Sequence, residues 1–64
     1  MNTAAHNDRR TLAAFDAVVN RGDAPTVTAM SQHSGLTARQ TLNALDRLTA
    51  AGVLRFGAMG WTRT

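Results

Sequence analysis

Glycines divide the second half of the chain into short periodic segments, and this division constrains the fold more than any other feature. Residues 28–64 have the sequence TAMSQHSGLTARQTLNALDRLTAAGVLRFGAMGWTRT. Gly35 and Gly52 each follow a segment of helical character, and Gly35 permits the positive φ angle that a sharp turn between two helices requires. The expected order is therefore a short helix, a tight turn, a longer helix and a β-hairpin.

The two helices of this region can be bounded from their caps and apolar spacing. Thr28 is expected to cap a short helix at 29–34, and Thr37 a longer helix that ends near Ala51. Four residues of the longer helix share one face at helical spacing, so that face is expected to pack in the core. These residues are Thr41, Ala44, Leu45 and Leu48.

The first part of the chain predicts one further helix behind a tail. We expect this helix to begin near Asp8, because its carboxylate can accept the free N–H groups of the first turn, and to end at Asn20 or Arg21. Its apolar stripe consists of Leu12, Phe15, Val18 and Val19. Residues 1–7 show no periodicity and are expected to form a disordered tail, which leaves 8–64 as the domain.

The end of the chain predicts a hairpin. Residues 53–56 and 61–64 alternate as two short strands around a turn at Gly57–Gly60, and Trp61 is expected to close the small core. Thr26–Val27 are expected to add a very short strand. Three helices followed by this hairpin make a mainly α domain with a small β-hairpin, which is the arrangement of a winged helix-turn-helix with a short wing.

The charge balance favours an anionic partner. The chain has 64 residues, seven basic and four acidic, for a net charge of +3. The basic residues are all arginines: Arg9, Arg10, Arg21, Arg39, Arg47, Arg55 and Arg63. The absence of lysine and glutamate is typical of a GC-rich genome, but this bias does not explain the excess of positive charge. A polyanion such as nucleic acid is therefore a candidate partner.

Composition also predicts the location of the chain. It contains no cysteine, which suits a reducing cytoplasm. No apolar run approaches the roughly 20 residues that span a bilayer, and the first residues lack the apolar stretch of a signal peptide. We therefore expect a soluble cytoplasmic protein without membrane contact.

A family resemblance rests on the helix-turn-helix segment. Residues 35–54, GLTARQTLNALDRLTAAGVL, resemble winged-helix regulators of the MarR type in the Gly–Leu turn, the Asp-Arg-Leu triplet at 46–48 and the glycine before an apolar strand. Residues 35–63, which end in GAMGWTR, also resemble the C-terminal winged helix of bacterial DNA-processing A proteins. The wing is shorter than in MarR proteins and lacks their acidic–basic tip, and the long dimerisation helices of that family are missing.

The resemblance implies a small bacterial or phage transcriptional regulator that binds double-stranded DNA in a sequence-specific manner. Residues 37–51 would be the recognition helix, with its first turn at base edges in the major groove. Arg39 would pair with guanine, and Gln40 or Asn43 with adenine, while Thr37 and the helix N-terminus would contact phosphate. The implied DNA-binding residues are Thr37, Ala38, Arg39, Gln40, Asn43, Arg47, Arg55 and Arg63.

The wing, which is the hairpin at residues 53–64, is expected to supply side chains that clamp phosphates. Because side chains alternate along a strand, Arg55 is expected on the face of the hairpin opposite to Leu54, and Arg63 on the same face as Trp61. Either arginine could clamp a phosphate or enter a minor groove. A solvated polar surface is the alternative interpretation for all of these side chains. Leu42 is expected to pack against the preceding helix, with a thymine methyl group as its alternative contact.

A second class of function stays open beside DNA binding. The fold also serves as a protein-interaction module within larger DNA-processing or regulatory assemblies, and the apolar Leu42 and Met59 favour that alternative. A homodimer and a larger protein partner are both compatible with it. An enzyme is not expected, because no Ser-His-Asp or Cys-His set and no phosphate-binding glycine loop is present. His6 and His33 lack a third ligand at metal spacing, so neither a metal nor another cofactor is predicted.

Overall fold

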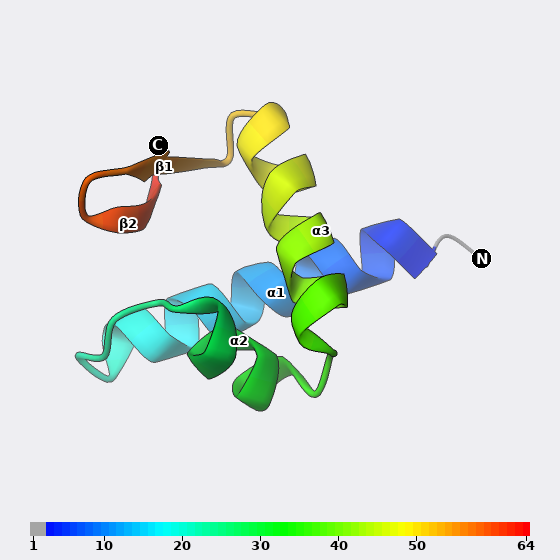
Figure 1. The fold of residues 1–64 in the computed structure, drawn as a ribbon, viewed down its shortest axis with the longest axis horizontal. Helices are drawn as coiled ribbons and strands as arrows, with labels where there is room; N and C mark the ends of the chain where they lie inside the picture. The colour runs from blue at the N-terminus through cyan, green and yellow to red at the C-terminus, as the bar shows by residue number, and fades with distance from the viewer. Residues whose placement is uncertain (1–2) are drawn as a thin grey trace.

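The fold consists of three helices followed by an antiparallel hairpin, as expected. A computed structural model describes residues 3–64 (Figure 1). Its elements are α1 (Thr3–Asn20), α2 (Val27–Ser34), α3 (Ala38–Ala50), β1 (Leu54–Gly57) and β2 (Gly60–Arg63). The helices pack on one another in every pairwise combination, and β1 packs on α3. The structure thus confirms a mainly helical domain of the winged-helix kind with a small hairpin.

The N-terminal boundary of α1 was predicted wrongly. The helix begins at Thr3 rather than near Asp8, so residues 3–7 are helical instead of a disordered tail, while residues 1–2 lie outside the described residues. The reason is that polar residues occupy the core-facing side of this part of α1. Asn7 and Thr11, one turn apart, are 8% and 0% exposed. A search for apolar periodicity does not detect such a face.

The start of α2 also differs from the prediction. Thr26 has extended backbone angles, and its Oγ1 accepts a hydrogen bond of 3.1 Å from the backbone N–H of Ala29. Thr26 is therefore the N-cap, and the short strand expected at Thr26–Val27 is absent. Val27 packs against the core cluster from the first turn of α2, which explains why the helix starts before Thr28.

A small apolar core lies between the helices and the hairpin. Its buried members are Ala14 and Phe15 of α1, Met30 of α2, Leu45 and Leu48 of α3, and Leu54 of β1. Trp61 is partly buried and packs against this cluster, as expected for a residue that closes the core. The four residues predicted for the buried face of α3 are all buried, so the orientation of α3 was predicted correctly.

The hairpin is tighter than expected. Gly57 and Gly60, predicted as turn residues, pair with each other at the ends of β1 and β2, so only two residues form the connection. Phe56 pairs with Trp61, and their rings lie 4.5 Å apart at 59°. Because strand residues alternate in facing, Leu54 and Phe56 share the face that carries Trp61 and Arg63, and Arg55 lies on the other face.

Leu45 should contribute more to stability than its neighbour Leu42. Leu45 is fully buried, whereas Leu42 is 43% exposed on the same helix. We expect Leu45→Ala to lower the free energy of unfolding by about 2–5 kcal/mol through lost burial and a residual cavity. Leu42→Ala, the matched control, should change it by less than about 1 kcal/mol. Urea denaturation followed by circular dichroism measures both, and equal losses would contradict the observed orientation of α3.

Candidate nucleic-acid interface

The side of α3 that faces solvent presents a polar stripe. Arg39, Asn43 and Asp46 are spaced by four and three residues, so they lie in a row along the helix. All three are exposed, and the row lies opposite the buried face that contains Leu45. Leu42 lies beside the row and is 43% exposed, so it is only partly packed. A cationic side chain and an amide thus occupy the first half of the exposed face, and a carboxylate follows them.

The turn before α3 is held by a compact set of hydrogen bonds. Ser31 Oγ donates to the carbonyl oxygen of Leu36 at 2.7 Å, and the Leu36 backbone N–H donates to Ser34 Oγ at 3.2 Å. Gly35 has a φ of 75°, as the sharp turn requires. These contacts fix where the N-terminus of α3 lies relative to α2.

Arg10 connects this turn to α1. Its guanidinium donates to the carbonyl oxygen of Ser34, the last residue of α2. A Cβ atom on Gly35 would lie 3.3 Å from the same guanidinium, which is a tight approach. Sequence reasoning missed Arg10, because no pattern indicates that a residue of the first helix reaches the end of the second. Its contribution is to the placement of α3.

A capping box begins α3 and uses two of the predicted site residues, Thr37 and Gln40. Thr37 Oγ1 accepts a hydrogen bond from the Gln40 backbone N–H at 3.0 Å, and Gln40 Oε1 accepts one from the Thr37 backbone N–H at 3.0 Å. The cap at Thr37 is therefore confirmed. Gln40 would have to leave this box to pair with adenine through both its oxygen and its nitrogen. Asn43 has no such engagement in the described residues.

Two of the predicted site arginines are bound to aspartates of α1. Arg47 Nε and Nη2 lie 2.9 Å and 2.8 Å from Asp8 Oδ1. Arg63 donates from Nε and Nη2 to the two carboxylate oxygens of Asp16, at 2.9 Å and 2.7 Å. These contacts join α3 and the wing to α1. Asp8, expected to cap the first helix, instead binds Arg47.

The Asp16–Arg63 contact changes the ionisation of both groups. Hydrogen bonds from Arg63, assisted by its charge, hold the pKa of Asp16 below its ordinary value, although desolvation acts in the opposite direction. The same hydrogen bonds raise the pKa of Arg63. Both side chains are nearly half exposed, so water screens their attraction and the contribution to stability is small.

The other two predicted arginines, Arg39 and Arg55, have no ionic or hydrogen-bonding partner within residues 3–64. Arg55 pairs across the hairpin with Thr62 on the face of the wing that points away from the core, and both are exposed. The structure therefore brings Thr37, Ala38, Arg39, Gln40 and Asn43 together at the start of α3. It places Arg55 on the wing, whereas Arg47 and Arg63 bind aspartates of α1.

No protein-family model matches the chain, and no curated protein or solved structure is significantly similar to it. None of the helices in residues 3–64 has the length and apolar character of a membrane span. The same residues contain no cluster of three or more side chains suited to hold a metal ion.

The Asp16–Arg63 contact should be detectable in the acid titration of Asp16. Because the folded-state pKa of Asp16 is lowered, its stabilising effect is fully present at neutral pH and is lost as the pH falls through that pKa. Arg63→Gln should raise the pKa of Asp16 toward the ordinary carboxyl value. Carboxyl ¹³C NMR titration of both proteins measures this shift. An unchanged Asp16 pKa in Arg63→Gln would show that the ion pair does not form in solution.

Proposed function

We propose that this chain binds double-stranded DNA by inserting the first half of α3 into the major groove, as a small regulator of transcription in the cytoplasm. The proposal is supported by the exposed row of Arg39 and Asn43 at the start of α3, opposite its buried face. A helix presented in this way by a preceding helix and tight turn suits insertion into a groove. The net charge of +3 favours approach to a polyanion.

The observation that supports this proposal most strongly is the unpaired state of Arg39. Three of the seven arginines form ion pairs with aspartates, and a fourth binds a backbone carbonyl. Arg39 has neither kind of contact among the described residues, although it lies in the first turn of an exposed helix. Its guanidinium can therefore pair with O6 and N7 of guanine without first losing an internal contact. Asn43, one turn later, can pair with adenine in the same groove.

Phosphate contacts would come from the helix end and the wing. The first N–H groups of α3, at Ala38 and Arg39, have no acceptor within the helix, and the small side chain of Ala38 permits close approach. The Thr37 hydroxyl keeps its proton for donation to phosphate, because it only accepts in the capping box. Arg55, on the outer face of the wing, is the proposed clamp of a flanking phosphate.

Three of the residues that the sequence predicts for DNA binding already form contacts within the domain, so we propose no DNA contact for them. Arg47 and Arg63 would each have to leave an aspartate before binding phosphate, so we assign them to the contacts that join α3 and the wing to α1. Gln40 is assigned to the capping box. Asp46 repels phosphate and lies in the second half of α3, which limits the proposed contact to its first two turns.

Binding to duplex DNA should weaken only moderately with salt. Arg55, the N-terminus of α3 and one further arginine side chain can together neutralise two or three phosphates. The slope of log K against log salt should thus be about −2 to −3, since each neutralised phosphate contributes about −0.9. Fluorescence anisotropy with labelled random and enriched duplexes at several salt concentrations measures the slope. Absence of binding at low salt would reject the DNA proposal and favour a protein-interaction module.

Substitutions should separate base contacts from phosphate contacts. Arg39→Ala should cost about 1–3 kcal/mol on an enriched preferred duplex and much less on random duplex, because it removes a base contact. Arg55→Ala should weaken both duplexes to a similar extent and make the salt slope shallower by about 1.

Arg63→Ala is the matched control, since it removes the same charge from the same hairpin. It should leave the salt slope nearly unchanged, because Asp16 already neutralises Arg63. Anisotropy titrations of the three variants, with circular dichroism to confirm folding, make the comparison. Equal weakening of preferred and random duplex by Arg39→Ala would contradict the role of α3.

A further inference from the structure

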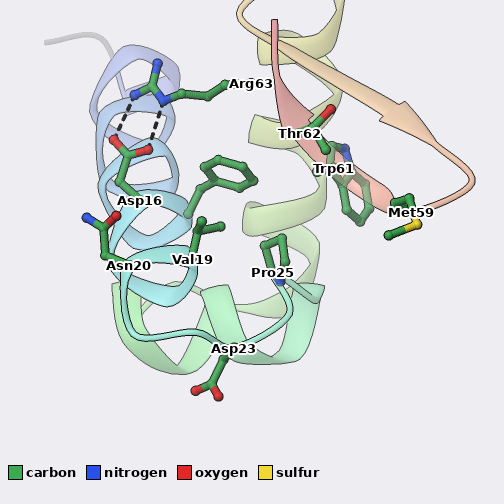
Figure 2. Close-up of a pocket in the computed structure, with 10 residues that line it drawn as sticks. Asp16, Val19, Asn20, Asp23, Pro25, Met59, Trp61, Thr62 and Arg63 are labelled. Carbon is green, nitrogen blue, oxygen red and sulfur yellow. Dashed lines mark hydrogen bonds and ion pairs between the residues drawn. The ribbon is translucent and has the colours of Figure 1, made fainter.

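The wing and α1 enclose an open groove whose lining residues the DNA proposal does not use. Figure 2 shows this groove between the second half of α1, the loop after it and the hairpin. It has a volume of about 470 Å³. Its apolar lining consists of Phe15, Val19, Pro25, Met59 and Trp61.

Exposed apolar side chains gather around this groove. The large apolar side chains that are exposed within residues 3–64 are Val19, Leu42, Phe56 and Met59. Val19 and Met59 line the groove, and Phe56 contacts the ring of Trp61 beside it. Met59 is 90% exposed at the turn of the hairpin, where no packing explains an apolar side chain. A gathered apolar patch of this kind is typical of an interaction site.

Charged groups stand at the two ends of the groove. The Asp16–Arg63 pair lies at one end, and Asp23 lies at the other (Figure 2). Asp23 forms its own ion pair with Arg21 at 2.6 Å. These side chains are between 43% and 58% exposed, so each keeps a face that a partner can reach.

We propose that a second copy of the chain binds at this groove in a two-fold symmetric dimer. In an isologous contact the same patch meets itself, so its two ends exchange places between the copies. Arg63 would then face Asp23 of the partner subunit, and Asp23 would face Arg63 of the partner subunit. Each of these contacts would bring an arginine of one copy to an aspartate of the other, beside the Asp16–Arg63 and Arg21–Asp23 pairs that each copy already forms. The apolar centre of the groove would be covered by the partner's Met59 and Val19.

The distribution of net charge favours a second copy at this place over others. The four charges of the Asp16–Arg63 and Arg21–Asp23 pairs cancel, so the whole net charge of +3 lies outside the groove region. Net charge therefore opposes contact between two copies less at the groove than at a surface that carries unpaired arginines. The exposed row of α3 is on another element, so the dimer does not need it and forms without DNA.

Sedimentation equilibrium of the DNA-free protein tests the proposal. We expect a monomer–dimer equilibrium with substantial dimer at about 1 mM chain, the weak end of specific association. The emission of Trp61, the only tryptophan, should shift to shorter wavelength as the dimer forms. A protein that stays monomeric up to this concentration, or that assembles beyond the dimer, would overturn the proposal.

Matched variants locate the contact. Met59→Glu should raise the dimer dissociation constant at least tenfold without unfolding, because Met59 is almost fully exposed. Leu42→Glu introduces the same charge at an exposed apolar position outside the groove and should leave it unchanged. Equal effects of the two substitutions would place the dimer contact elsewhere.

A second pair of variants tests the charge complementarity. Asp23→Arg should weaken the dimer, since it places an arginine opposite Arg63 of the partner subunit. Asp46→Arg, on the exposed row of α3, changes the net charge by the same amount as Asp23→Arg. It therefore controls for general electrostatic repulsion between two copies. If both weaken the dimer to the same extent, the two-fold pairing of Asp23 with Arg63 is wrong. Because DNA is absent, these outcomes are separate from those of the DNA experiments.

Discussion

The burial of α3 against α1 is the interaction on which the rest of the structure depends. Ala44 and Leu45 are fully buried, and the helices contact one another along this face. In a domain this small, no second layer covers the outside of α3, so burial of one face leaves the opposite face in solvent. The exposed position of Arg39 and Asn43 therefore follows from apolar packing.

Ion pairing then distinguishes arginines that the sequence presents as equivalent. Three of the four aspartates bind arginines, and two of these contacts, at Asp8 and Asp16, join α1 to α3 and to the wing. Such exposed pairs contribute little to stability, but they determine which cations are available to a ligand. Arg9, Arg39 and Arg55 have no ion-pair or hydrogen-bond partner within the described residues, and two of them, Arg39 and Arg55, belong to the elements proposed to contact DNA. The wing's inward-facing Arg63 is instead held at the rim of the apolar groove.

The sequence predicted the three helices, the hairpin and the buried face of α3 because these depend on local patterns. Helical spacing located Thr41 and Leu45 in the core, and Thr37 was identified as a cap from its position before the helix. The extension of α1 to Thr3 could not be found in this way, since its core-facing residues there are polar. The partners of Arg47 and Arg63 lie 39 and 47 residues away in the chain, and only the folded structure brings them together.

The proposed function rests on contact between the exposed start of α3 and duplex DNA. The most direct measurement is a titration of ¹⁵N-labelled protein with an enriched duplex, followed by NMR. We expect the largest shifts at the backbone amides of residues 37–43 and at the Nε–H of Arg39, with a smaller shift at Arg55 and little change at Arg63. Shifts confined to the groove between α1 and the wing, or no shifts at all, would contradict it.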